Sequence, residues 1–522
     1  MTSADIISEA EELDDVSESS PLLSDQVVDV HTLPRRLKRR IILLLCAFAF
    51  MMMLGDSLQP AALSQIFEDI ICDDHYNKHL SSNINASATP APADPCKTHP
   101  VQKELALVRG IQQLMPTFAA LLCTVPYGLL AERIGRKRVL ILSGTGAFAS
   151  LAWVLAVCYW RFGSIRLVWL SGAFLFIGGG DAVASSVVHV MVTDTTDQAE
   201  RARIFLFLHA ADVISGFFGP AISAALMEKG DAWTVMLLAQ AVLFLGTFLL
   251  TQCIPETLRL RDKLSGGSLT FTPSQLAPSS PPETAHPVPL GTRLDGVARV
   301  LSSPQSVLAR NRQALLLLFV FAPQTAARDL FTMVGLQYSS SKYSLSYSRG
   351  NVLLSLFQGA QGFIALVILP LITRLVAEPR GWTGWARDRF YAIMSIAATA
   401  SGLMVVAVAP SLATEVVGLL LVAVGSCTTG LLMSLLGEAV QPSQVSTVYS
   451  VALMLSIAVR GATGPLMNGL FVKGLELGWS WMGLPFAVTA VLMAGVMVMS
   501  TFIQAEERWR QRQVTKRRLR DE

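Results

Sequence analysis

Twelve apolar runs, each close to the length that crosses a bilayer, follow one another along this chain. A helix needs about 20 apolar residues to span the hydrocarbon core, whereas a barrel strand needs only about 10. The runs show no strand-type alternation of apolar and polar residues. We therefore predict membrane-spanning helices at 41–66, 105–130, 139–159, 166–192, 204–227, 234–254, 313–337, 350–376, 389–409, 412–437, 445–470 and 481–503.

The composition supports a membrane protein and excludes two other classes. Charged residues make up only 15% of the 522 residues, and apolar residues make up 52%. A soluble domain carries about 25% charged residues, and a disordered chain lacks this apolar content. The expected fold class is an all-α polytopic membrane protein with its helices in two groups of six.

The positions of the basic residues set the expected orientation. Most of the 41 Lys and Arg residues fall in segments that share one side of the membrane with both termini, and cytosolic segments carry such an excess. We expect a cytosolic tail at 1–40, a first bundle at 41–254 with an outer loop at 67–104, a cytosolic linker at 255–312, a second bundle at 313–503 and a basic cytosolic tail at 504–522.

The outer loop contains features of an extracellular segment. Asn85 begins an Asn-Ala-Ser glycosylation sequence, which fits a surface loop on the side where glycosylation takes place. Cys72 and Cys96 lie in the same loop, and a disulfide between them is plausible on this oxidising side.

The loop after the second predicted helix is the most specific motif of the chain. Residues 128–138 read Gly-Leu-Leu-Ala-Glu-Arg-Ile-Gly-Arg-Lys-Arg. We expect the first glycine to let two helices approach closely, the carboxylate to cap a neighbouring helix, and the arginines to reach acidic partners. The expected gate residues are Gly128, Glu132, Arg133, Gly135, Arg136 and Lys137. Two further ion pairs are expected as latches, Asp194 with Arg133 or Arg136, and Glu438 with Arg374.

This loop resembles the signature loop of the major facilitator superfamily, with Glu132 in place of the usual Asp. Two Gly-x-x-Gly-Pro elements, at 216–220 and 461–465, lie at corresponding places of the two halves, and Pro-Glu-Thr-Leu at 255–258 is also frequent in that family. The resemblance covers about 41–503. It implies two pseudo-symmetric six-helix bundles and transport by alternating access.

Two smaller features are similar to particular branches of the superfamily. Gly180-Asp181 and the cysteine-containing outer loop resemble the proton-coupled folate transporters. They also resemble fungal transporters, many of which export secondary metabolites.

Charged residues inside the predicted helices indicate a water-filled interior. A charge at the centre of a membrane helix costs about 3 kcal/mol on insertion scales, so these residues should face one another or a cavity. Asp181 and Asp212 are the predicted proton carriers. His209, one helical turn from Asp212, is expected to share or tune that proton. Static ion pairs between helices are the alternative for each carboxylate.

A second set of polar residues is predicted to line the substrate cavity. Adjacent positions on a helix point about 100° apart, so Arg328 and Asp329 should each need a partner on another helix. The positive charges are expected to hold a substrate carboxylate or to reset the proton carrier. The cavity residues predicted are Asp56, Arg328, Asp329, Gln358, Gln361 and Arg460, with Phe357 as a further contact.

No known catalytic or nucleotide-binding motif appears in the chain, and neither intramembrane histidine has metal-ligand spacing. We expect no enzyme activity, no catalytic residues, no cofactor, no metal and no nucleic-acid partner. The function predicted is a proton-driven efflux pump for a secondary metabolite or drug. It would act as a monomer in the lipid bilayer, most plausibly in the plasma membrane, with a vacuolar or endosomal membrane as the alternative. Proton-coupled uptake of an organic anion, or a sensor that does not transport, are the competing functions.

Overall fold

The computed structural model describes residues 35–82, 95–196, 198–258, 312–440 and 445–503. Twelve helices in these ranges are long and apolar enough to cross a membrane, which confirms the predicted fold class. The helices of the first half are α2 (Arg35–Ser82), α3 (His99–Ile134), α4 (Arg136–Trp160), α5 (Ser171–Leu175), α6 (Gly180–Thr195), α7 (Gln198–Lys229), α8 (Ala232–Phe244) and α9 (Thr251–Cys253).

The second half repeats the pattern of long helices with several short irregular turns. Its elements are α13 (Arg312–Leu330), η4 (Phe331–Gly335), α14 (Leu336–Tyr343), α15 (Tyr347–Phe363), η5 (Ile364–Ile368), α16 (Leu369–Ile372), η6 (Thr373–Ala377), α17 (Gly384–Val408), α18 (Leu412–Val424), η7 (Gly425–Cys427), α19 (Thr428–Ala439), α20 (Val445–Leu477), η9 (Trp479–Trp481) and α21 (Leu484–Thr501).

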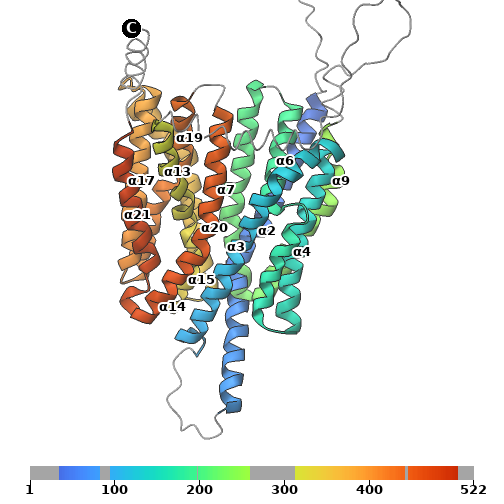
Figure 1. Cartoon of the computed structure of the whole chain (residues 1–522), viewed down its shortest axis with the longest axis vertical. Helices are drawn as coiled ribbons and strands as arrows, with labels where there is room; N and C mark the ends of the chain where they lie inside the picture. The colour runs from blue at the N-terminus through green and yellow to red at the C-terminus, as the bar shows by residue number, and fades with distance from the viewer. Residues whose placement is uncertain (1–34, 83–94, 197, 259–311, 441–444, 504–522) are drawn as a thin grey trace, which may run out of the picture.

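Each half has its own hydrophobic core. One cluster of buried side chains lies within 41–254, and the other lies within 314–503 with Ala61 and Ala106 added from the first half. The halves stand side by side in Figure 1. They meet along two seams, where α3 packs on α20 and α7 packs on α15. Any cavity for a transported molecule must lie between these seams.

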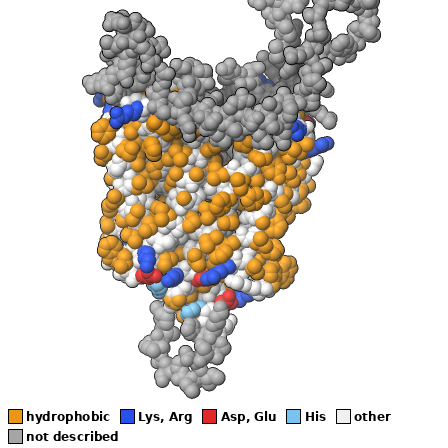
Figure 2. Space-filling view, in the orientation of Figure 1, with side chains coloured by type: hydrophobic (Ala, Val, Ile, Leu, Met, Phe, Trp, Pro, Cys, Tyr) orange, Lys and Arg blue, Asp and Glu red, His pale blue; other side chains and the backbone are white. Residues whose placement is uncertain are grey.

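The flank of the bundle is apolar, as a lipid-facing surface requires. Figure 2 shows hydrophobic side chains covering the side of the molecule, with charged side chains gathered toward its two edges. We call the end where α3 finishes and α4 begins the inner end, and the end that holds Cys72 and Cys96 the outer end. The names follow the predicted orientation.

The fourth membrane span is broken, which corrects the continuous helix predicted at 166–192. Residues 178–180, three consecutive glycines, have φ values of 87°, 79° and 60°, in the left-handed region that favours glycine. A Cβ on Gly179 would come within 2.9 Å of the Cβ of Cys123 in α3. Gly178 therefore lies outside the helix that carries Asp181. The glycines allow the backbone to leave the helical conformation and allow the neighbouring helices to pack closely around the break.

The break leaves backbone groups without helical partners, and neighbouring helices satisfy two of them. The hydroxyl of Tyr127 donates to the carbonyl of Phe176 at 3.0 Å, and that of Ser143 donates to the carbonyl of Gly180 at 2.5 Å. Irregular backbone at this depth is tolerated only with such partners. As a result, Asp181 lies in the first turn of a new helix, α6, where the helix dipole favours a negative charge.

Candidate functional site

A cavity of about 550 Å³ lies between the halves, mostly on the side of the first bundle. Its volume is within the usual range for small-molecule sites. Apolar side chains such as Leu63, Met115 and Ile457 form part of its wall. The charged and polar residues that line it are Asp56, Gln59, Arg109, Gln112, Gln113, Thr117, Ser150, Ser171, Asp181, Thr332 and Arg460.

Two carboxyl groups meet in the wall of this cavity. Those of Asp56 and Asp181 lie within hydrogen-bonding reach of each other, and the amide of Gln59 donates to Asp56 Oδ1 at 3.3 Å. Asp181 Oδ1 is buried without a hydrogen-bond donor in the described part of the chain. Two carboxylates this close repel each other unless a proton lies between them. The pair is therefore a place where one proton can be held.

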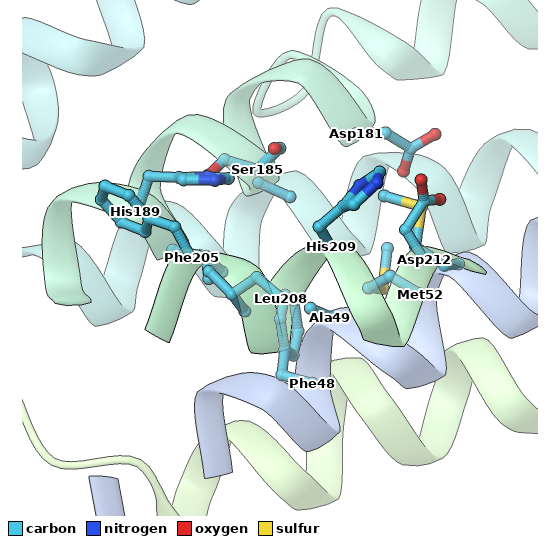
Figure 3. A pocket seen from close by; sticks show the side chains of 13 residues that line it. Phe48, Ala49, Met52, Asp181, Ser185, His189, Phe205, Leu208, His209 and Asp212 are labelled. Carbon is cyan, nitrogen blue, oxygen red and sulfur yellow. The ribbon is translucent and has the colours of Figure 1, made fainter. Parts of the chain in front are cut away.

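A second pocket, of about 230 Å³, continues from Asp181 toward the inner end. Figure 3 shows the ring of His209 pointing toward the carboxyl groups of Asp181 and Asp212. The side chains of His209 and Asp212 are exposed to this pocket rather than packed. The structure thus brings the three predicted proton-carrying residues together around one water-accessible space.

The remaining histidine of this pocket lies apart from that group. His189 lies apart from His209 in Figure 3 and packs against Phe205, with 5.2 Å between the ring centroids. Its Nδ1 is 2.7 Å from the carbonyl oxygen of Ser185, one turn back on the same helix. These contacts fix the ring locally.

Three charged residues predicted for the cavity form a continuous set of ion pairs between α13 and α20. Asp329 Oδ2 forms an ion pair with Arg460, 2.9 Å from its Nε, and the other oxygen of Asp329 is 3.4 Å from Arg328 Nε. The contact with Arg460 is the expected partner on another helix. The contact with Arg328 corrects the expectation that adjacent residues stay apart, because the long arginine side chain bends back over its neighbour.

Polar side chains from α3 bind the second half beside the cavity. The amide nitrogen of Gln113 donates to the carbonyl of Met333 at 3.1 Å. Met333 lies in η4, a π-helical turn whose widened ladder frees backbone groups. Asn468 in α20 donates to Gln113 Oε1 at 3.4 Å. Gln113 thus connects α3 to both η4 and α20.

The glutamines predicted on the eighth span lie elsewhere. Gln358 and Gln361 are not among the residues that line either pocket. Gln358 faces Gly216 across the seam between α7 and α15. Phe357 is 1% exposed and packs against Phe331, with 5.7 Å between the ring centroids, so it belongs to the core. Helical periodicity alone does not distinguish a seam or core face from a cavity face.

The outer end is closed by a polar cluster that the sequence did not reveal. We call it the outer lock. Glu68, only 4% exposed, accepts from Lys97 at 2.5 Å, from Tyr347 at 2.5 Å and from Gln102 at 3.0 Å. Gln337 donates to Gln102 at 2.8 and 3.0 Å. Glu68, Lys97 and Gln102 come from the first half, and Tyr347 and Gln337 from the second.

A disulfide holds the segment that carries Lys97 in place. Cys72 and Cys96 are bonded, and their Cα atoms are 5.3 Å apart. Because Lys97 follows Cys96 directly, the bridge keeps its ammonium group beside Glu68 and also 2.6 Å from the hydroxyl of Ser340. The sequence had placed Glu68 and Lys97 in an outer loop, where polar residues are ordinarily solvated.

At the inner end, the following contacts of Arg136 and Lys137 in the signature loop lie within the first half. Arg136 Nε is 3.4 Å from Asp194 Oδ2, and both side chains are 6% exposed. Glu256 accepts from the backbone N–H groups of Arg136 and Lys137 at 2.8 and 3.1 Å. It therefore caps the start of α4, where the helix dipole favours a negative charge. Gly135 has a φ of 106° and lies against this carboxylate.

The other residues predicted for the gate have less defined places. A Cβ on Gly128 would meet nothing within 4 Å, so the close helix approach predicted there is wrong for this conformation. Glu132 and Arg133 are exposed. The capping carboxylate comes from Glu256, in the Pro-Glu-Thr-Leu segment, and not from the loop itself.

The second half has a different inner contact. Arg374 and Glu438 are both exposed, and their pairing stays a prediction. Asp388 in α17 accepts from the Ser434 hydroxyl at 2.7 Å and pairs with its neighbour Arg387 at 2.8 Å. The acid here is on the ninth span, whereas the corresponding third span carries the basic Arg136.

Two remaining predictions concern glycosylation and metal binding. Asn85, the predicted glycosylation site, lies outside the described residues. Within the described ranges, no group of three or more His, Cys, Asp or Glu side chains is arranged to hold a metal ion.

Comparisons with known proteins agree with this architecture. The chain is 29% identical over 92% of its length to the MFS efflux pump atnC of Emericella nidulans, of which it covers 91%. It is 28% identical over 85% of its length to the MFS-type transporter avaK of Aspergillus versicolor, of which it covers 88%. The nucleoside transporter NupG has the same fold, with a TM-score of 0.57 at 12% identity over 90% of this chain and 99% of that one. The family model of the Major Facilitator Superfamily matches residues 45–456, and the chain belongs to this superfamily of membrane transporters.

Proposed function

We propose that the chain is a proton-driven efflux pump for a small organic metabolite, working by alternating access in the plasma membrane. The observation that carries the proposal is the cluster of Asp56, Asp181, His209 and Asp212 around two pockets that share Asp181 in their walls. It combines a place for a proton with a space for a small molecule. Two relatives across most of the chain are called efflux pumps or transporters, which supports export.

The proposed mechanism uses a change in protonation to change the attraction between the halves. Arg460 of the second half is close enough to Asp56 of the first half for their charges to interact. When the Asp56–Asp181 pair loses its proton, the attraction to Arg460 grows. When the pair is protonated, Arg460 is free to hold something else. His209 and Asp212 would pass the proton between this pair and the inner end, and the chain would act as a monomer.

Proton-coupled uptake of an organic anion is the second candidate. Arg460 and Arg328 favour it, because a proton and an anion that neutralise each other are readily carried together. Both functions use the same residues and differ in direction. A single flux experiment therefore separates them.

The test uses the purified protein in sealed vesicles with an imposed pH gradient. A panel of small organic metabolites is offered, and the vesicle contents are measured by mass spectrometry. We expect gradient-driven movement in the wild type, its loss in Asp181→Asn and Asp212→Asn, and retained exchange in both variants without a gradient. The direction of movement assigns export or uptake.

Asp73→Asn is the matched control. It removes a carboxylate that is 55% exposed and paired with Arg161 at the surface, so transport should stay at the wild-type rate. Normal gradient-driven transport by both Asp181→Asn and Asp212→Asn would contradict the proposed coupling. Absence of any flux across the panel would contradict transport of this substrate class.

A further inference from the structure

Arg460 is an exposed charge at the middle of a membrane-spanning helix. It lies halfway along α20 and lines the large cavity, and its side chain is 61% exposed. An unpaired charge at this depth is costly. A side chain kept open to the cavity in such a place needs a partner that enters and leaves.

Its geometry leaves one edge of the guanidinium group available. Asp329 holds Nε at 2.9 Å. Within the described part of the chain, the two terminal nitrogens of Arg460 have no hydrogen-bond partner. Terminal nitrogens in this fork match the two oxygens of a carboxylate, and such bidentate pairs are both strong and directional. The ion pair with Asp329 occupies the Nε side of the guanidinium group.

The charges around the cavity are consistent with an anionic guest. Arg109 and Arg460 line it, as do Asp56 and Asp181, while Arg328 and Asp329 offset each other next to Arg460. One proton on the Asp56–Asp181 pair leaves the arginines in excess. A bound anion restores the balance in a region of low dielectric, where an unbalanced charge is unfavourable.

The apolar part of the cavity wall suits an organic skeleton. Leu63, Met115, Met333 and Ile457 contribute apolar surface to the same cavity. A pocket with apolar walls and one directional polar anchor orients a ligand by its polar end. An inorganic anion would leave this apolar surface uncovered.

From these observations we propose that Arg460 is the specificity-determining residue of the carrier and binds a carboxylate of the substrate. The transported molecule is then an organic anion with an apolar body. The inference rests on the proposed function, since it takes the cavity to be the substrate site, but it holds for either direction of transport.

The test compares ligands that differ only in charge. Three pairs of probes increase in size: benzoate and benzamide, 1-naphthoate and 1-naphthamide, and pyrene-1-carboxylate and pyrene-1-carboxamide. Dissociation constants are measured by calorimetry on the purified full chain in lipid nanodiscs. We expect at least one carboxylate to bind the wild type about 10- to 100-fold more tightly than its amide, the range of a charge-assisted pair.

Three variants assign that preference to the residue. Arg460→Gln should lose the preference and still bind the amide, which shows that the pocket is folded. Arg460→Lys should keep part of it, because the charge remains while the fork is lost. Arg349→Gln makes the same charge change at an exposed arginine outside both pockets and should keep all of it.

Three outcomes would overturn the proposal. In the first, no carboxylate binds the wild type more tightly than its amide. In the second, Arg460→Gln retains the preference. In the third, Arg349→Gln loses as much of it as Arg460→Gln does. Because binding is measured without a gradient, its result is separate from the flux experiment. If a carboxylate binds but no flux is seen, the proposed transport is contradicted and the carboxylate site is not. If only neutral molecules are transported, the carboxylate site is contradicted and the proposed transport is not.

Discussion

The two ends of the bundle are held in different ways. At the outer end, buried hydrogen bonds cross from one half to the other, with Glu68 accepting from Tyr347 and Gln102 accepting from Gln337. At the inner end, the ion pair of Arg136 with Asp194 and the bond of Ser434 to Asp388 each stay within one half. These outer contacts tie the halves together, whereas these inner contacts stabilise each half separately.

This difference shows which contacts set the conformation. An interaction between the halves must break when the bundle opens on that side, but an interaction within a half persists. The structure is therefore closed at the outer end. The signature loop, which the sequence suggested as a lock between halves, acts here as a stabiliser of the first bundle.

Removing the charge of Glu68 should have the largest effect. Glu68→Gln leaves Lys97 partly buried without its partner, which costs about 3 kcal/mol in comparable cases. The population of the conformation closed at the outer end should then fall about 100-fold relative to the conformation open at that end. We expect a shorter distance between spin labels at Arg138→Cys and Arg380→Cys, near the inner end, in a chain whose native free cysteines are replaced by serine.

Glu104→Gln is the control for this measurement. Glu104 pairs with Arg166 at the outer surface, and both residues belong to the first half. The charge change is the same, but no bond between halves is lost, so the label distance should stay as in the wild type. An unchanged distance in Glu68→Gln would show that the outer lock does not hold this conformation.

The outer lock also marks the limit of what the sequence predicts. Twelve spans follow from apolar length alone, because the bilayer leaves few other solutions. The acidic residues at mid-membrane are equally visible, since charge there is rare. Glu68 and Lys97 gave no such signal, because each looks like an ordinary loop residue until the folding of the chain places it against the other half.

The broken fourth span shows a second limit. Three glycines in an apolar run are compatible with tight helix packing and with a break, and periodicity does not decide between them. The positive φ values of 178–180 depend on how closely α4 approaches. The sequence predicted Asp181 as a proton carrier but did not predict its position at the start of a helix.

Weakening the inner contact should reduce stability and leave the conformation unchanged. Asp194→Asn leaves the charge of Arg136 unpaired where its side chain is 6% exposed. We expect the free energy of unfolding of the first half to fall by about 2 kcal/mol. The midpoint of thermal unfolding should fall with it. The label distance at the inner end should match that of the wild type.

Asp388→Asn is the equivalent change in the second half. Its partner Arg387 has a side chain that is 36% exposed, so water replaces part of the lost interaction. The midpoint should fall by less than in Asp194→Asn. A change of label distance in Asp194→Asn would mean that the inner contact does act between the halves.

The duplicated Gly-x-x-Gly-Pro elements provide the smallest and most local test of the same comparison. A Cβ on Gly219, the second glycine of the first element, would meet Ser57 within the first half. A Cβ on Gly461, the first glycine of the second element, would meet Thr117 across the seam between halves. Each alanine variant should lose about 1–2 kcal/mol through overpacking. Only Gly461→Ala should also change the label distance, because only that contact moves when the halves move. Gly469→Ala, on the same helix with nothing within 4 Å of its Cβ, should cause neither effect. Equal changes of label distance in Gly219→Ala and Gly461→Ala would mean that a glycine packed within one half influences the conformation as much as a glycine packed across the seam.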